Sequence, residues 1–178
     1  MNIFWLDRYC DNAARYHDDS RIVKMVVEAA QCIAAGLRIR ARDPLSDIRL
    51  REVEAFDVYD PFNMDNALPH WCAESQSHMK KVHGMVFELD RQYRGRFDSE
   101  ERHASAKAVK RWLPLIRRVP EHGWRDPPFY GPDEYDTGNL VDDYRRYFAY
   151  EKGDNATYAA GEVPEWWPDD APQPTTHA

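Results

Sequence analysis

Apolar residues recur at three- or four-residue spacing along several stretches of the chain, a pattern that predicts α-helices. The clearest helix is expected from Asp19 or Ser20, either of which can cap the first turn, to about Leu37. With successive residues about 100° apart around the axis, its apolar side chains share one broad face: Ile22, Val23, Val26, Ala30, Ile33 and Ala34. The opposite face is polar and carries Arg21, Lys24, Glu28 and Gln31.

The same spacing predicts three further helices, over residues 66–93, from residue 99 to just before Pro114, and over residues 140–152. Residues 40–65 and 119–136 contain prolines and no sustained period, so we expect long loops there, with a short strand-like piece at 52–58. The expected fold class is therefore mainly all-α, a compact single-domain bundle of about four helices with long Pro-rich loops.

The chain of 178 residues has the length of one ordinary domain. We expect residues 1–160 to form this helical domain and residues 161–178 to form a Pro-rich, acidic tail that is partly disordered. The adjacent Trp166 and Trp167 are expected to dock back on the body of the protein.

Several function classes lack their sequence signatures. The chain has no Walker-A loop, GxGxxG, HExxH, GxSxG or EF-hand loop, which argues against ATPases, dinucleotide oxidoreductases, zincin proteases and serine hydrolases. No apolar run approaches the length of about 20 residues that spans a bilayer, and no signal segment is visible, so we expect a cytoplasmic protein with no membrane partner. The three cysteines show no CxxC pairing and the seven histidines are scattered, so no metal site is expected.

The formal net charge of −7 argues against a general nucleic-acid binder, which usually carries a basic surface. More than half of this excess lies in the last twenty residues, which hold four acidic side chains and no basic one. The charge is therefore a caution about nucleic-acid binding and does not exclude it.

The strongest polar constellation is the segment from His17 to Gln31, HDDSRIVKMVVEAAQ. Arg21, Lys24 and Glu28 occupy positions i, i+3 and i+7 of the predicted helix and project from one side. A solvated face with a Lys24–Glu28 pair, worth a few tenths of a kcal/mol, is the simpler interpretation. The functional interpretation is a carboxylate beside two cations, placed to hold a phosphodiester and to act as acid or base. Periodicity alone does not choose between them.

A second constellation lies in the last predicted helix. Tyr144, Tyr147 and Phe148 are expected in the core, whereas Arg145 and Lys152 share an outer edge and could contact phosphates. The preceding Asp133 and Glu134 could pair with these cations or act as helix-capping acids.

Six of these stretches resemble a family of small, largely uncharacterised proteins common in tailed-virus genomes. The matching segments are residues 2–7 (NIFWLD), 17–31, 66–71, 132–135 (PDEY), 144–148 (YRRYF) and 164–166. One departure concerns Arg21, which stands where the family usually has a second histidine.

The stretch from Asp19 to Glu28 is also similar to viral pyrimidine-dimer DNA glycosylases, which are small helical enzymes. This resemblance implies that Glu28 is the catalytic carboxylate and that Arg21 and Lys24 contact the DNA backbone around a base taken out of the stack. The nucleophile of those enzymes is a free α-amine on a small second residue after removal of the first methionine. The second residue here is Asn2.

The leading hypothesis is a virus-encoded enzyme that acts on DNA bases or nucleotides in the host cytoplasm, either excising a base or transferring a group onto a modified pyrimidine. The alternative is a non-enzymatic interaction protein, a host-takeover or anti-defence factor that binds a host protein and whose acidic surface mimics nucleic acid. For the enzyme, the expected catalytic residues are Glu28, Lys24, His17 and Asp19. The expected substrate-binding residues are Arg21, Gln31, Asn2, Tyr144, Arg145 and Lys152. The sequence indicates no particular cofactor.

Overall fold

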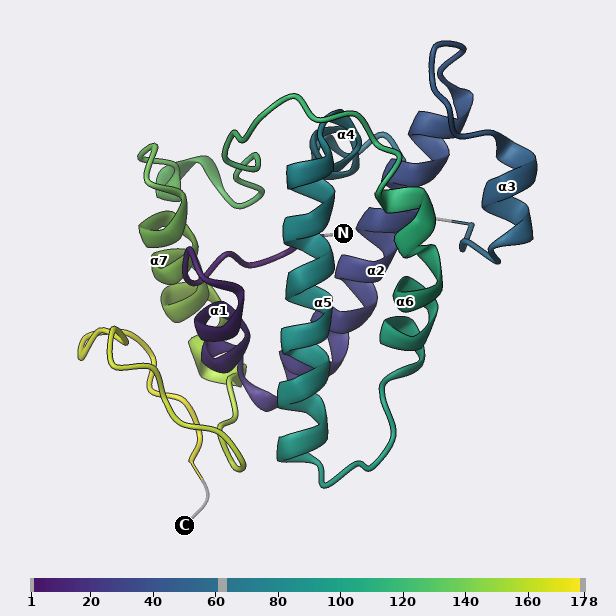
Figure 1. The fold of residues 1–178 in the computed structure, drawn as a ribbon. Helices are drawn as coiled ribbons and strands as arrows, with labels where there is room; N and C mark the ends of the chain where they lie inside the picture. Colours follow the sequence, from purple (N-terminus) through teal and green to yellow (C-terminus); the bar gives the residue numbers. More distant parts are fainter. Residues whose placement is uncertain (1, 61–63, 177–178) are drawn as a thin grey trace.

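Seven α-helices carry the fold of the computed structural model, which describes residues 2–60 and 64–176 (Figure 1). They are α1 (Cys10–Tyr16), α2 (Asp19–Arg42), α3 (Leu50–Ala55), α4 (Ala67–Glu74), α5 (Gln76–Arg96), α6 (Ala104–Ile116) and α7 (Leu140–Lys152). Two 3-10 turns, η1 (Asp133–Tyr135) and η2 (Gly153–Asn155), flank α7, and an isolated bridge joins Thr157 to Thr175. Since the described residues form no strand, the all-α prediction is confirmed there, whereas the predicted count of about four helices is wrong.

The two longest helices, α2 and α5, pack against each other at the centre, with α4 and α6 beside them and α1 against α5 (Figure 1). A glycine permits the close approach of α2 to its neighbours. A Cβ atom on Gly36 would lie 3.1 Å from the Met79 side chain and 3.5 Å from the Cys72 sulfur. The core is therefore assembled around α2, the helix that also carries the polar constellation.

The helix predicted over residues 66–93 is interrupted at Ser75, whose extended backbone separates α4 from α5. The Ser75 hydroxyl donates to Glu121 (2.8 Å) and accepts from the His122 backbone N–H (3.1 Å). Hydrogen bonds to a distant loop hold this break, so helical periodicity could not reveal it.

Helix α6 differs from its prediction at both ends. It begins at Ala104, because the buried Asp90 accepts the His103 backbone N–H (2.7 Å) and an Arg102 hydrogen bond (2.9 Å), which keeps the residues before it out of the helix. It also continues through Pro114 to Ile116. The prediction of a loop over residues 40–65 is also wrong, since this stretch contains α3. Residues 61–63 of the stretch lie outside the described part. The other predicted loop, residues 119–136, contains η1 near its end.

The segment before α1 is extended and buried. Ile3, Phe4, Trp5 and Leu6 are each at most 7% exposed, and they lie between α7 and the central helices (Figure 1). The burial of this segment therefore holds the neighbouring Asn2 close to α2.

The described part of the tail also contacts the body. Trp167 and Ala171 are buried, Trp166 packs edge-on against Tyr16, and the Thr175 backbone exchanges hydrogen bonds with Ala156 and Tyr158. The domain boundary at residue 160 and the partial disorder of the tail stay predictions, and residues 177–178 lie outside the described part.

Candidate functional site

The first turn of α2 shows why its polar residues have separate tasks. Asp18 caps the helix: one carboxylate oxygen accepts the backbone N–H groups of Ser20 (2.9 Å) and Arg21 (3.1 Å). The other carboxylate oxygen pairs with the Arg21 guanidinium, which also lies 5.1 Å from the centre of the Phe148 ring. Arg21 is thus engaged in holding α2 to α7, and Asp18 takes the capping role expected of Asp19 or Ser20.

Asp19 connects α2 to α5 and to the segment just before the tail. One of its oxygens pairs with Arg96 (3.0 Å), and the other accepts the backbone N–H groups of Ala159 (2.8 Å) and Ala160 (3.1 Å). With its hydrogen-bonding capacity used in this way, Asp19 lies among structural contacts and lines neither of the two cavities described below.

His17 is fully buried between the rings of Phe4 and Phe148. Its Nδ1 lies 2.7 Å from the Ala13 carbonyl oxygen, and its Nε2 has no hydrogen-bond partner among the described residues. Burial lowers the pKa of this imidazole from 6.5 to about 4, because charging it would require desolvating a cation. The structure therefore places His17 in the core as a neutral ring.

A cleft of about 530 Å³ forms around Glu28 on the outer side of α2. One Glu28 oxygen accepts the backbone N–H of Asn2, 2.5 Å away, and the other lies 3.4 Å from the Lys24 ammonium. The Glu28 side chain is only 14% exposed, whereas that of Lys24 is 70% exposed. Glu28 is therefore a shielded carboxylate beside an exposed cation at the wall of a cavity.

The opposite wall of this cleft comes from α7 and from the loop that precedes it. Tyr147 and Lys152 line it from α7, with the Lys152 ammonium 5.0 Å from the centre of the Tyr147 ring. Phe129 and Tyr130 line it from the loop. Segments far apart in sequence thus bring two cations, one carboxylate and several aromatic rings to the same cavity.

Tyr144 fixes the relation between the loop and the first residues of the chain. Its hydroxyl donates to the Asn2 side-chain oxygen (3.0 Å) and accepts the Tyr130 backbone N–H (3.1 Å), while the Asn2 amide donates to the Tyr130 carbonyl (2.7 Å). Burial raises the pKa of the Tyr144 phenol well above its usual value, so the hydroxyl stays protonated. Asn2 and Tyr144 accordingly hold the loop at Tyr130 against the start of the chain, beside the cleft.

Four of the six predicted substrate-binding residues do not line the cleft: Arg21 and Tyr144, described above, and Arg145 and Gln31. Arg145 donates to the Leu6 carbonyl (2.8 Å), pairs with Asp7 (3.1 Å) and contacts the rings of Tyr16 and Trp166, so it holds the start of the chain and the tail together. Gln31 is half-buried one turn beyond Glu28 and does not line the cavity.

The site includes residues that the sequence did not single out. Phe4, Phe129 and Tyr130 supply aromatic walls, together with Tyr147, which was expected in the core and is instead half-buried at the cleft. The sequence PPFYGPDEY held a usable signal, since two aromatic residues stand between prolines and a glycine directly before the last helix. Nothing in that local pattern indicates contact with α2, because the contact depends on the path of the whole loop.

Within residues 2–60 and 64–176, no three His, Cys, Asp or Glu side chains gather as ligands for a metal ion. None of the helices in that part of the chain is both long and apolar enough to cross a bilayer.

In comparisons with known proteins, no family model matches this chain, and no curated protein or solved structure matches it significantly.

Proposed function

We propose that the protein is an enzyme that acts on DNA bases or nucleotides, with Glu28 as its acid or base. The supporting observation is the convergence of Glu28, Lys24, Asn2 and Lys152, from three separate segments, on one cleft. A solvated Lys–Glu pair on a helix would leave the carboxylate exposed and would need no other segment. Here the carboxylate is shielded and faces a cavity that also holds a second cation.

The composition of the cleft suits a nucleotide substrate. Lys24 and Lys152 offer ammonium groups for phosphate oxygens, and the rings of Tyr130, Tyr147, Phe129 and Phe4 offer surfaces on which a base can stack. A carboxylate between these elements lies within reach of the sugar and base of a bound nucleotide. This is the arrangement that proton transfer to or from a base requires.

The reaction is either excision of a base, as in a glycosylase, or transfer of a group onto a modified pyrimidine. For excision, the nitrogen of Asn2 beside Glu28 is the candidate nucleophile, because removal of Met1 would make it an α-amine, and about half of such amines are neutral near pH 8. This nitrogen would bond to C1′ while the bond from C1′ to the base breaks; the base would leave with the bonding electron pair and take up a proton. Glu28 would accept a proton from the amine nitrogen and pass it to O4′ as the C1′–O4′ bond breaks, so that the ring opens to a hydroxyl group and an imine between C1′ and the nitrogen.

The test is a DNA-processing assay on damaged, thymine-modified and plain duplexes, with mass spectrometry of the released nucleosides and borohydride to trap an imine. Glu28→Gln is compared with Glu88→Gln, which alters another intrahelical ion pair, that of Glu88 with Arg91 (2.7 Å) on α5. Base release, group transfer or a trapped adduct that disappears only in Glu28→Gln supports the proposal. No product on any duplex from a folded protein contradicts it and favours the interaction-protein alternative, which pull-downs from host extract would then examine.

A further inference from the structure

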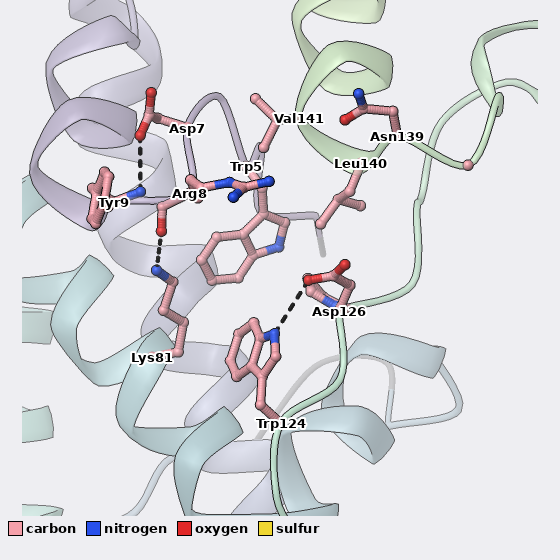
Figure 2. Close-up of a pocket in the computed structure, with 12 residues that line it drawn as sticks. Trp5, Asp7, Arg8, Tyr9, Lys81, Trp124, Asp126, Asn139, Leu140 and Val141 are labelled. Atoms are coloured by element: carbon pink, nitrogen blue, oxygen red, sulfur yellow. Dashed lines mark hydrogen bonds between the residues drawn. The ribbon is translucent and has the colours of Figure 1, made fainter.

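A second cavity of about 740 Å³ is lined by Trp5 and Asp7 of the segment at residues 2–7 (Figure 2). It is bounded by that segment, α5, the loop at residues 124–127 and the amino end of α7, and it shares no lining residue with the Glu28 cleft. Its volume falls within the range of about 300–1,000 Å³ that is usual for small-molecule sites. Because the two sets of lining residues are separate, ligand binding in this cavity does not depend on the role of Glu28.

The side chain of Trp5 presents an unsatisfied hydrogen-bond donor to this cavity. Trp5 is 2% exposed, and its indole Nε1 has no hydrogen-bond partner among the described residues. Figure 2 shows this nitrogen directed toward the side of the cavity formed by Leu140 and Asp126. Because a buried indole N–H nearly always finds an acceptor, its position indicates a ligand that supplies one.

Trp124 forms an aromatic wall of the same cavity. Its ring is 51% exposed and rests edge-on against Trp71 and His78, which are stacked on each other. Its indole N–H donates to Asp126 (3.3 Å), which leaves the other Asp126 oxygen able to accept from a ligand. A flat ring lying on Trp124 would thus meet the Trp5 donor and a carboxylate acceptor, the pair of partners that a nucleobase edge requires.

The rim of the cavity carries two cationic side chains, Arg8 and Lys81. Arg8 is exposed, and no acidic side chain in the described ranges pairs with it. Lys81 donates to the Arg8 carbonyl, and the first residues of α7, Leu140 and Val141, also line the cavity (Figure 2). Asp7 is already paired with Arg145 (3.1 Å), so Arg8 and Lys81 remain the cations available for an anion at this rim.

We infer that this cavity binds a nucleotide, with its base on Trp124 and its phosphate at Arg8 and Lys81. The base accepts from Trp5 Nε1 and donates to Asp126, while the phosphate lies at the rim formed by Arg8 and Lys81. The same chemistry is present in a free mononucleotide and in one nucleotide of a single strand. This site is separate from the proposed reaction cleft and does not depend on it.

The experiment is a titration of the full-length, 15N-labelled protein with each of the four deoxynucleoside monophosphates and with a short single-stranded oligonucleotide. The readouts are the NMR signal of the Trp5 indole N–H and the dissociation constant from calorimetry. Deoxyadenosine without phosphate is titrated as well. Arg8→Gln is compared with Arg111→Gln, an exposed arginine on α6 that lines neither cavity.

The expected result is a shift of the Trp5 indole signal by at least one probe and a loss of affinity of about tenfold or more in Arg8→Gln but not in Arg111→Gln. Binding of a monophosphate assigns the site to free nucleotides, and binding of the oligonucleotide alone assigns it to a strand. Trp5→Phe should also weaken binding. If that variant does not fold, the indole signal of the unaltered protein and the affinity of Arg8→Gln still test the inference. The inference is overturned if no probe moves the indole signal, if Arg8→Gln binds normally, or if deoxyadenosine binds as tightly as its monophosphate.

Discussion

The carboxylate of Glu28 accepts the backbone N–H of Asn2, which joins the middle of α2 to the start of the chain. Tyr144 on α7 holds the side chain of the same asparagine, and the loop at Tyr130 is attached through both residues. These hydrogen bonds set the width of the cleft in which Lys24 and Lys152 lie. The contact thus positions the only shielded carboxylate among the residues that line this cleft in the described chain.

Replacement of Lys24 or Lys152 by glutamine should weaken binding of DNA or nucleotide to a similar extent for different sequences. Each lysine is expected to contact phosphate, so each substitution should reduce the slope of log affinity against log salt concentration by about 1. Fluorescence anisotropy at several salt concentrations measures the slope. Lys110→Gln, an exposed lysine on α6, is the matched control, and equal slopes in all variants would contradict phosphate contact at the cleft.

The sequence contained part of this site and part of the fold. Regular periodicity was sufficient to locate α2 and α7 and to place Lys24 and Glu28 on one face, because these features depend on local spacing. The interruption at Ser75 was hidden because it depends on hydrogen bonds to residues 121 and 122.

The same limit explains the mixed placement of the candidate residues. His17, Asp19, Arg21 and Arg145 carry chemistry that suits a site, but each also contacts a residue of a distant segment that holds it in a packing role. Only three-dimensional proximity distinguishes them from Glu28.

Stability should decrease as the pH falls from about 6.5 to about 4 because of His17. The folded-state pKa is lowered to about 4, so between these values the unfolded chain binds a proton that the folded chain does not. Above about pH 6.5, His17 should therefore cause no loss of the free energy of unfolding. By about pH 4, the free energy of unfolding should be lower by on the order of 3 kcal/mol.

Chemical denaturation between pH 4 and pH 7 tests this expectation. His17→Gln should remove most of the pH dependence in this range, with the remainder arising in part from His83 and His103, whose pKa values are also lowered by burial. An unchanged pH dependence in His17→Gln would show that the buried imidazole does not control it.

Asp19→Ala should loosen the attachment of residues 159–160, which lead into the tail, to the body. The substitution removes the acceptor of the Ala159 and Ala160 N–H groups and leaves the nearly buried Arg96 without its carboxylate partner. Loss of one partner of such an ion pair should lower the free energy of unfolding by about 3 kcal/mol.

Limited proteolysis with mass spectrometry should detect faster cleavage after residue 158 in Asp19→Ala. Glu101→Gln, which alters an exposed ion pair with Lys107, serves as the control and should be cleaved at the rate of the unaltered protein. If the tail of Asp19→Ala resists cleavage equally well, its attachment rests on Trp167 and the Thr175 bridge instead.

The most direct test of the role of Glu28 is the single-turnover rate of product formation on the best duplex, measured for the unaltered protein, Glu28→Gln and Glu88→Gln. Glutamine keeps an acceptor for the Asn2 N–H and loses only an exposed lysine partner, so Glu28→Gln should unfold within about 1 kcal/mol of the unaltered protein. Its rate should nevertheless fall by about 100-fold or more, as expected for loss of a general acid or base, while Glu88→Gln keeps the full rate. A Glu28→Gln protein that is folded and reacts at the unaltered rate would contradict the account and leave Glu28 as an anchor for the first residues of the chain.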